Sequence, residues 1–325
     1  MTKLKRTAQS TFTDDTSMRL RAAWLYHGQD LTQNEVAERL GIGRSTTIRL
    51  LEEAKKRGEV RIWIEEGVSE LVELALKLET AFDLDEVIVV PASNTADQTA
   101  KSVGLALGKF LSETISDNMT IGVGWGRTLT SSLASFHPAH HTGIKIMSLL
   151  GGSVETHFAN PVEFAWRIAN TLDAECYLFP APVFVDSAAT KEMLIKHCGL
   201  EPIFQMAQKL DLAIVSAGDI NRDSTSLVRN FISARENEEL LKLGCVGEVM
   251  CNFLDAQGNL VAHSLNERVM SIGLDTLKSA AHLVLASGGA SRAQSIFAAI
   301  KSINCNTLVT DEAAAMKLLK MSSAS

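Results

Sequence analysis

Positive charge and short hydroxyl side chains are concentrated in AERLGIGRSTTIRLLEEAKKRG, residues 37–58 of a 325-residue chain whose formal net charge is −7. The spacing of the apolar residues predicts a helix over residues 44–57. Arginine and small hydroxyl side chains at the start of a helix reach phosphate oxygens and base edges when the helix lies in the major groove of DNA. The predicted DNA contacts of this helix are Arg44, Ser45, Thr46, Thr47 and Arg49.

The end of the same helix has two interpretations. Lys55, Lys56 and Arg57 either approach the phosphate backbone or only complement the negative end of the helix dipole. We include Lys55 among the candidate DNA contacts. A second predicted helix, residues 33–40, begins after Thr32, whose hydroxyl and the carboxylate three positions later form a capping-box pattern. Thr32 and Gln33 complete the candidate DNA contacts.

The rest of the first 66 residues would support these helices. A first helix over residues 18–26 is predicted to turn Leu20, Ala23 and Trp24 inward. The sequence GIG at residues 41–43 predicts a short turn, because glycine tolerates positive φ and the isoleucine can fill the gap between helices. Residues 60–64, VRIWI, predict a strand that would form a short wing. Residues 1–66 are therefore predicted to be a winged helix-turn-helix DNA-binding domain.

Charge divides the chain in the same place. Residues 1–61 contain twelve Lys plus Arg and eight Asp plus Glu, a net charge of +4, so the remaining residues carry −11. A basic head on an acidic body is typical of a nucleic-acid-binding protein with a separate second domain. An amphipathic helix over residues 69–82 either pairs two chains or packs on its own body. We assign residues 67–84 to a linker or dimerisation helix and residues 85–325 to an effector domain.

Short apolar runs alternate with predicted helices throughout the second domain. The runs fall at residues 86–92, 120–126, 144–152, 175–185, 212–218, 247–255, 282–289 and 306–311. The helices include residues 98–114, 161–171, 292–302 and 312–320. This alternation predicts an α/β domain with a mostly parallel, doubly wound sheet covered on both faces. Ligands of such sheets bind where strands end and helices begin.

Three loops that follow predicted strands carry polar signals. Backbone amides at a helix start, together with a guanidinium or a hydroxyl, can hold a phosphate. Glycine in any one of these loops has the alternative role of making a tight turn. A dinucleotide fingerprint is disfavoured, because Arg127 stands where GxGxxG requires its third glycine. The candidate residues of the loops are Gly124, Gly126, Arg127 and Thr128; Gly151, Gly152 and Ser153; and Gly288, Gly289 and Arg292.

Composition excludes several other classes. No segment has the roughly 18 apolar residues that a membrane span needs, and the first residues lack the apolar stretch of a signal peptide. We therefore expect a cytoplasmic protein with no membrane partner. The five cysteines include no CxxC pair or companion histidines, so they are predicted to be buried reduced thiols, with no metal site and no cofactor.

These motifs resemble those of a known family. Residues 31–64 resemble the DNA-binding head of the SorC family of bacterial sugar-responsive transcription regulators. Six further family motifs follow in the family's order: GVGWGRTL, LLGG, VGEVMCNFLDAQGNLV, LNERV, ASGGASRAQSIFAAI and LVTDEAAAMKLL. The resemblance implies an effector domain related to the ribose-5-phosphate isomerase and glucosamine-6-phosphate deaminase group. It also implies a homodimer or homotetramer that binds a double-stranded DNA operator of a carbohydrate or polyol catabolic operon.

The resemblance also implies roles for individual residues. Arg127, Thr128, Gly151, Gly152 and Arg292 would line the phosphate side of a sugar or sugar-phosphate site, while Asp255, Asn266 and Arg268 would hold hydroxyls. The family usually has GGExK in its last glycine loop, whereas this chain has GGASR at residues 288–292. Arginine in place of lysine keeps the positive charge. The missing carboxylate at Ala290 removes a hydroxyl acceptor and indicates a different sugar or polyol.

An enzyme is the alternative interpretation. The body would then be a sugar-phosphate isomerase or deaminase with a regulatory head, and Asp255 or Asp219 could serve in acid/base chemistry. The sequence shows no paired acids and no Ser/His/Asp grouping, and the loop LLGGS at residues 149–153 has no lysine for a Schiff base. A plain isomerase also has no use for a basic head. We therefore predict a regulator with no catalytic residues.

Overall fold

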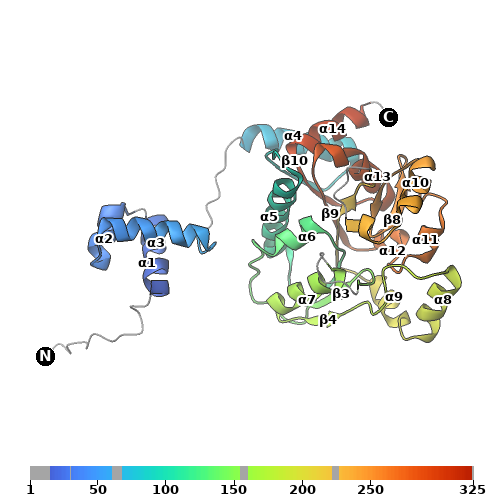
Figure 1. Cartoon of the computed structure of the whole chain (residues 1–325), viewed down its shortest axis with the longest axis horizontal. Coiled ribbons are helices and arrows are strands. Elements are labelled where there is room, and N and C mark those ends of the chain that lie inside the picture. The colour runs from blue at the N-terminus through green and yellow to red at the C-terminus, as the bar shows by residue number, and fades with distance from the viewer. Residues whose placement is uncertain (1–14, 30, 61–67, 154–159, 222–226, 324–325) are drawn as a thin grey trace. The chain divides into compact units, whose positions relative to one another are not determined.

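The computed structural model describes residues 15–29, 31–60, 68–153, 160–221 and 227–323. The chain divides into two compact units, residues 1–66 and 67–325, which we call the head and the body (Figure 1). No described helix is both long enough and apolar enough to cross a membrane.

The described part of the head consists of α1 (Asp15–His27), α2 (Gln33–Leu40) and α3 (Arg44–Lys56). The capping box at Thr32 is confirmed: its side chain accepts the Glu35 N–H, and the Glu35 carboxylate accepts the Thr32 N–H. Gly41 ends α2 with φ of 67°, as the predicted turn requires. Small and branched apolar side chains form the shared core of the three helices, among them Ala22, Ala23, Val36, Leu50, Leu51 and Ala54.

The inward face of α1 differs from the prediction. Leu20 and Trp24 were expected in the core, but 46% and 65% of their surfaces are exposed. Two alanines and Arg19 take the inward positions, and Arg19 is only 1% exposed. Its guanidinium binds both carboxylate oxygens of Glu59, with Nε–Oε2 and Nη2–Oε1 distances of 2.6 and 2.7 Å. Apolar periodicity could not predict this orientation, because a buried ion pair determines it. Apart from Val60, the predicted wing lies outside the described residues.

The body contains a seven-stranded parallel sheet, so the predicted α/β class is confirmed. Its strand order is β1-β10-β9-β5-β2-β3-β4. The strands are β1 (Glu86–Val90), β2 (Thr120–Val123), β3 (Lys145–Ser148), β4 (Glu175–Tyr177), β5 (Leu212–Val215), β9 (His282–Ala286) and β10 (Thr307–Asp311).

Helices cover both faces of this sheet. Successive residues of β5 enter different cores: Ile214 packs with residues of α5 (Ala96–Thr114) and α7 (Pro161–Leu172), whereas Val215 packs with residues of α13 (Ala293–Ile303) and α14 (Glu312–Ser322). A short helix, α6 (Arg127–Ser132), packs closely on α5. Burial on both faces explains why the central strands are continuous apolar runs without polar alternation.

The predicted linker helix belongs to the body. It is α4 (Val68–Phe82), and it contacts β1 and α14. Leu78 is fully buried, and the Phe82 ring meets Phe297 of α13 edge-on at 5.7 Å. Packing on its own body is thus observed. Val72 and Leu76 remain 50% and 57% exposed, so the helix also has an uncovered apolar side.

Two of the predicted strands are shaped differently. Residues 247–255 do not form one strand: β7 (Cys245–Val249) and β8 (Asn252–Asp255) form an antiparallel hairpin, and β6 (Ala217–Gly218) pairs with β7 to give a separate small sheet. Met250 and Cys251 turn the hairpin with φ of 49° and 60°, where glycine or asparagine is usual. In residues 175–185 the strand ends at Tyr177, before two prolines that cannot donate to a ladder.

Shorter helices complete the body. They are α8 (Ala188–His197), α9 (Glu201–Ala207), η1 (Leu227–Asn230), α10 (Ala234–Lys242), α11 (Ser264–Arg268), α12 (Leu274–Leu277) and η2 (Ala290–Arg292). α9 contributes Ile203 and Ala207 to the same core as α13 and α14.

Candidate DNA and effector sites

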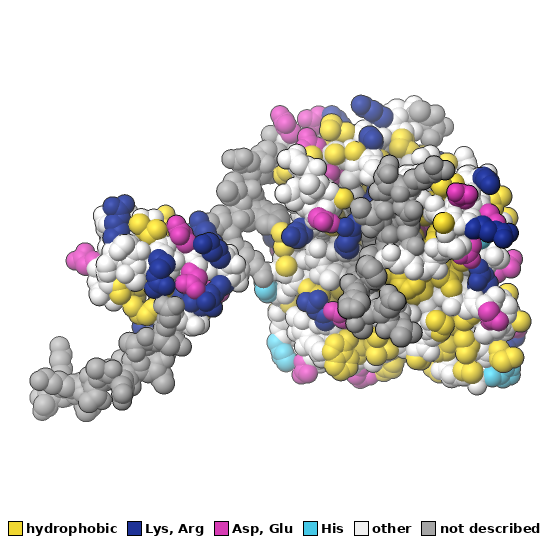
Figure 2. Space-filling view, in the orientation of Figure 1, with side chains coloured by type: hydrophobic (Ala, Val, Ile, Leu, Met, Phe, Trp, Pro, Cys, Tyr) yellow, Lys and Arg dark blue, Asp and Glu magenta, His cyan; other side chains and the backbone are white. Residues whose placement is uncertain are grey.

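The outer side of α3 carries most of the predicted DNA contacts. Arg44 and Ser45 are exposed at the start of the helix, Thr46 is half-buried, and Arg49 exposes 61% of its side chain. Figure 2 shows Lys and Arg side chains spread over the visible face of the head. A side chain at this exposure can reach a phosphate or a base edge without unfolding the helix.

Thr47 does not belong to that surface. It is fully buried, and its hydroxyl donates to the Gly43 carbonyl at 3.4 Å. Thr47 shares the inward face of α3 with Leu50, Leu51 and Ala54, since residues three and four apart lie on one side of a helix. The prediction that Thr47 faces outward was wrong, and we leave it out of the candidate site.

The remaining basic residues of the head are partly balanced by acids. Arg49 and Arg57 both pair with Glu53, at 3.6 and 2.7 Å, while Lys55 is exposed at the last turn of α3. Gln33 is half-buried at the start of α2. Thr32 is exposed, but its hydroxyl already donates to Glu35 in the capping box. Helix capping accounts for Thr32 without any ligand.

The body has a topological switch point between β2 and β5. The chain continues from β2 toward β3 and β4, and from β5 in the opposite direction toward β9 and β10. In open α/β sheets, ligands bind outside the carboxyl ends of the strands at such a point. Because all these strands are parallel, residues 124–128 after β2, residues 216–219 after β5 and residues 288–292 after β9 lie at this one edge. Two of the three predicted loops thus follow the strands on either side of β5. The third, residues 149–153, follows β3, which is the neighbour of β2.

Two arginines lie in the loops at the switch-point edge. Arg292 Nε lies 3.5 Å from Asp219 Oδ1, and only 11% and 6% of the two side chains are exposed. Arg127 Nη1 lies 2.5 Å from Asp97 Oδ1 of α5 and is 30% exposed. Burial lowers the pKa of the Arg292 guanidinium; Asp219 opposes this change, and the nearby charge of Arg127 lowers the pKa further. The proximity of two guanidinium groups concentrates positive charge where an anion would be stabilised.

Buried carboxylates accompany these arginines. Besides Asp219, Glu248 of β7 is 5% exposed and acts on Arg292 through its charge. Its Oε2 accepts the Cys251 N–H at 2.7 Å. Lys317 of α14 donates to the carbonyl oxygen of Ala290 at 3.0 Å. Carboxylates near Arg292 thus come from segments other than its own loop, which the motif could not reveal.

Glycine is favoured in these loops by backbone conformation at some positions and by close packing at others. Gly126 and Gly289 have φ of 131° and 105°, which other residues rarely adopt, and each lies at the start of the helix that carries an arginine. Gly151 and Gly288 are instead required by packing. A Cβ atom on Gly151 would lie 2.5 Å from the Ala181 carbonyl oxygen, and one on Gly288 would lie 2.9 Å from Val103.

Other predicted members of the phosphate side are placed as follows. The Gly124 N–H donates to Ile214 O at 2.8 Å, so this amide is used within the sheet. Thr128 is 2% exposed at the start of α6. Gly152 and Ser153 line a cavity beyond β3 that is described below. In the described part of the chain, no group of three His, Cys, Asp or Glu side chains is arranged to hold a metal ion.

Asp255 lies in the turn after β8, beside the second half of α13. It closes the turn after β8 by accepting the N–H groups of Gln257 and Asn259, both at 2.9 Å. Gly258 of this turn approaches the backbone near Ala298 and Ser302, in the last turns of α13. α13 begins beside Arg292 and spans about 16 Å at 1.5 Å per residue. Asp255 therefore cannot share a sugar site with Arg292, and we leave it out.

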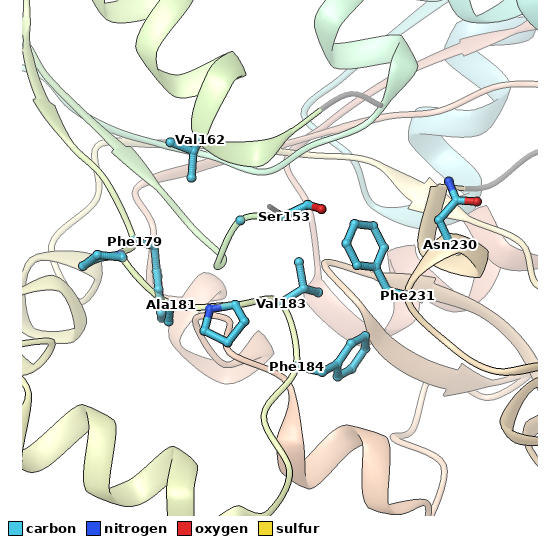
Figure 3. Close-up of a pocket in the computed structure, with 11 residues that line it drawn as sticks. Ser153, Val162, Phe179, Ala181, Val183, Phe184, Asn230 and Phe231 are labelled. Carbon is cyan, nitrogen blue, oxygen red and sulfur yellow. The ribbon is translucent and has the colours of Figure 1, made fainter. Parts of the chain in front are cut away.

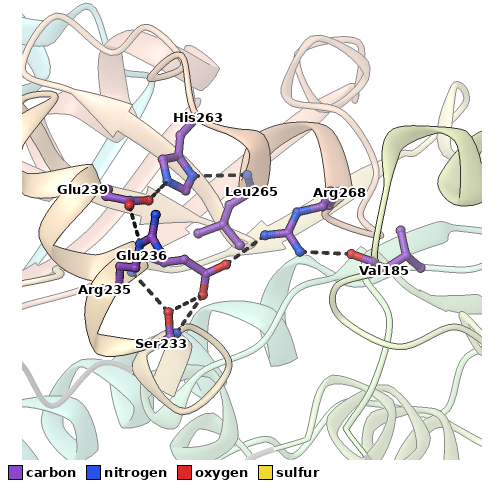
Figure 4. A network of polar contacts seen from close by, with 8 residues as sticks. All are labelled: Val185, Ser233, Arg235, Glu236, Glu239, His263, Leu265 and Arg268. Atoms are coloured by element: carbon purple, nitrogen blue, oxygen red, sulfur yellow. Dashed lines mark hydrogen bonds and ion pairs between the residues drawn. The ribbon is translucent and has the colours of Figure 1, made fainter.

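Asn266 and Arg268 have structural partners as well. Asn266 Oδ1 accepts the Phe253 N–H, and its amide donates to the carbonyls of Phe253 and Val261. Arg268 donates to Glu236 Oε1 at 2.8 Å and to the Val185 carbonyl at 3.3 Å (Figure 4). Hydroxyl binding was predicted for both residues, but their contacts instead join α11 to neighbouring segments, and neither is retained in the proposed site.

The Arg268 contacts belong to a larger network. Ser233 and Glu236 form a capping box at the start of α10, and His263 bridges Glu239 at 3.3 Å and the Leu265 N–H at 3.2 Å (Figure 4). The segment after Arg268 then joins two loops through backbone hydrogen bonds, from Gly151 N–H to Met270 and from Met270 N–H to Val183. Residues 268–272 thus hold the loop after β3 and the loop after β4 together.

The family follows from comparison with known proteins. Residues 66–320 match the family described as "Putative sugar-binding domain". The chain belongs to the SorC family of sugar-binding transcriptional regulators. It is 31% identical over 307 residues to the erythritol catabolism regulatory protein EryD of Brucella abortus, covering 94% of this chain and 97% of that protein. It is also 31% identical to the deoxyribonucleoside regulator of Bacillus subtilis, over 92% of this chain and 96% of that protein.

A solved SorC-family structure extends the similarity to the fold. The full-length sorbitol operon regulator SorC of Klebsiella pneumoniae matches with a TM-score of 0.70 and 25% identity, covering 94% of this chain and all of that one. The similarity to SorC-family proteins therefore includes both the head and the body. The family predicted from sequence motifs is confirmed, and the named relatives are transcriptional regulators, as predicted for this chain.

Proposed function

We propose that this SorC-family protein binds an operator of a carbohydrate or polyol catabolic operon, and that a phosphorylated sugar or polyol at the switch-point edge controls this binding. The observation that supports the proposal is that one chain carries two separate basic sites. The head exposes Arg44 and Arg49 on one helix, while the body brings Arg127 and Arg292 together at the end of its sheet.

The head would act as a helix-turn-helix domain. α2 and α3 are joined by three residues, and α3 is amphipathic, with Leu50 and Leu51 in the core and Arg44 and Arg49 outside. Such a helix can enter the major groove, and two copies would read a near-palindromic operator. Phosphate contacts release counterions, so operator affinity would fall steeply with salt concentration.

The body would bind the anionic end of the effector. Arg127 and Arg292 supply charge-assisted donors, and Asp219 would accept a hydroxyl of the same ligand. A ligand changes the affinity for DNA only by its different affinities for the two states of the protein. A coupling free energy of about 1–3 kcal/mol corresponds to a change in operator affinity of roughly 5- to 150-fold.

Oligomers are part of this proposal. Two or four chains would place two α3 helices on one operator. The uncovered side of α4, with Val72 and Leu76 half-exposed, offers an apolar surface for pairing in addition to its packing on the body.

We also propose that the body is related to the ribose-5-phosphate isomerase and glucosamine-6-phosphate deaminase group and serves for sensing instead of catalysis. Of the two carboxylates considered for acid/base chemistry, Asp219 is ion-paired with Arg292, and Asp255 closes the turn after β8, beside the second half of α13. Neither placement favours a general base beside a sugar.

Operator binding in the presence of candidate effectors tests the proposal. DNA would be selected by the wild-type protein from random duplexes, and phosphorylated sugars and polyols would be screened by thermal shift. A ligand at 100 times its Kd stabilises the protein by about 2.7 kcal/mol. The best ligand should change operator affinity, and Arg292→Gln should remove this response while DNA binding persists. Lys301→Gln, at the far end of α13, is the matched control. An unchanged response in Arg292→Gln would contradict the effector site.

A further inference from the structure

A cavity of about 710 Å³ lies beside the arginine-bearing edge. It is formed by the loop after β3, the start of α7, the segment after β4 and the end of η1. Figure 3 shows Phe184 and Phe231 near one another at this cavity, with Val162 across from them in this view. Its volume lies in the range of pockets that hold small molecules. We call it the apolar pocket.

The described residues that line the apolar pocket carry few polar side chains. Eight of its eleven lining residues have apolar side chains, and among the described lining residues only Ser153 and Asn230 carry polar ones. Pro180 and Pro182 have no N–H group. The Gly152 N–H donates to Ala181 O and the Val183 N–H donates to Gly152 O. The Ala181 and Phe231 N–H groups donate to Phe179 O and Val228 O within their own segments. Among the described lining residues, these backbone N–H groups are thus already engaged and are not free to bind a ligand hydroxyl.

The apolar pocket and the switch-point edge are formed by neighbouring segments. β3, whose loop supplies Gly152 and Ser153, is the direct neighbour of β2, and the Leu149 N–H donates to Val123 O at 2.9 Å. Adjacent strands lie about 4.8 Å apart. Phe231 of the apolar pocket meets Trp125 edge-on at 5.3 Å, and Trp125 stands two residues before Arg127. The loop that carries Arg127 therefore begins next to a wall of the apolar pocket.

We infer that the effector is a sugar phosphate whose end remote from the phosphate is apolar, with a methyl group or deoxy carbon where most sugars carry a hydroxyl. This inference rests on the proposed function, because the arginines must take the phosphate. Phe184 and Phe231 contact the apolar end, while Ser153 and Asn230 bind hydroxyls in the middle of the molecule. A hydroxyl buried against the phenylalanines loses its hydrogen bonds to water without replacement.

Matched sugar phosphates test the inference. The 1-phosphates of fructose, tagatose and sorbose would each be compared with the corresponding 6-deoxy compound by thermal shift and calorimetry, with inorganic phosphate as the baseline. In the pair that binds most tightly, we expect the 6-deoxy compound to bind about 10- to 100-fold more tightly, the range over which apolar pockets discriminate against an added hydroxyl.

Two variants separate the pocket from the arginine site. Phe184→Asn should reduce the preference for the 6-deoxy compound to less than about threefold, because the amide can pair with the hydroxyl, whereas Phe184→Leu should retain the preference. The response to inorganic phosphate should be equal in both variants and in the wild type, which controls for folding.

The outcomes distinguish the two claims. Equal or tighter binding of the 6-hydroxy compounds overturns the inference and leaves the proposed function intact. Binding of inorganic phosphate with no gain from any sugar overturns the sugar-phosphate effector itself, and the inference with it. A preference that survives Phe184→Asn places the apolar end elsewhere and also overturns the inference.

Discussion

The arginines of the head and of the body stand in opposite environments. Arg49 exposes 61% of its side chain on α3, whereas Arg292 exposes 11% and lies beside a buried carboxylate. An exposed guanidinium keeps its water until a polyanion arrives, so it suits a large, salt-sensitive interface. A buried guanidinium has already lost most of its water and needs a fixed partner, so it suits one small anion in one orientation.

Removing exposed arginines should affect DNA binding most strongly and folding least. Arg44→Ala combined with Arg49→Ala should weaken binding to the selected operator by about 4 kcal/mol, close to 1000-fold, because each base or phosphate contact contributes about 1–3 kcal/mol. Mobility shift at several salt concentrations would also show a shallower salt dependence. Lys101→Ala with Lys109→Ala, two exposed lysines of α5, is the charge-matched control. Equal losses in both double variants would contradict the role of α3.

Removing a partner of the buried arginine should affect stability instead. Asp219→Ala should lower the free energy of unfolding of the body by about 3 kcal/mol, since breaking a buried ion pair leaves a desolvated charge. Asp97→Ala removes the partner of Arg127, but 75% of the Asp97 side chain is exposed, so its loss should cost less than about 1 kcal/mol. Denaturant titration of both variants measures this difference. Similar costs would show that burial does not distinguish the two pairs.

The Arg268 network should show an intermediate effect that extends to ligand affinity. Arg268→Ala loses its bonds to Glu236 and Val185 and should cost about 2 kcal/mol, as expected for hydrogen bonds that involve charged groups. Because Phe184 precedes Val185, binding of the effector should weaken as well, while operator binding without effector stays unchanged. Lys278→Ala removes an exposed surface pair and serves as the control. Normal effector affinity in Arg268→Ala would separate this network from the apolar pocket.

The same network predicts that the stability of the body decreases at acidic pH. Burial raises the pKa of Glu236, but hydrogen bonds from Ser233 and Arg268 and the charge of Arg268 outweigh it, so the pKa lies below its ordinary value of 4.5. The stabilisation from Glu236 is therefore fully present above pH 4.5 and is lost as the pH falls through the lower folded value. Wild type and Glu236→Gln should differ in unfolding free energy at pH 7 and converge once the pH has fallen below the lowered pKa of Glu236. A difference that does not depend on pH would contradict this.

The smallest effect is expected in the head. Thr32→Ala removes the N-cap of α2 and should destabilise the head by about 1 kcal/mol without changing the stability of the body. Thr32→Ser keeps the hydroxyl and should behave as wild type. Amide hydrogen exchange of α2 and α3 would measure the difference. If Thr32→Ser loses operator affinity while the head keeps its stability, Thr32 contacts DNA directly.

Local patterns predicted much of this molecule. The capping box at Thr32, the turn at Gly41 and the loops around Arg127 and Arg292 depend on residues close together in the chain, and the apolar runs that predicted the parallel sheet are local patterns as well. The errors share a cause. Thr47 faces the core because packing sets the rotation of α3, and Trp24 is exposed because Arg19 pairs with Glu59, forty residues away. Arg268 was expected at the ligand, but it binds Glu236 and Val185, which lie in distant segments. Asn266 was also expected there, and it binds the backbone of the nearby residues Phe253 and Val261.

By itself, the sequence determined most strands of the parallel sheet and the main helices beside them, the family of the chain and the loops that carry arginine, because these properties follow from local spacing and composition. The tertiary structure alone decided what surrounds those arginines. Strand order places β5 between β2 and β9, and so brings Asp219 to Arg292 and the two glycine loops to one edge. It also sets Phe184 and Phe231 in the apolar pocket, because burial and contact depend on the folding of segments that are far apart in the chain.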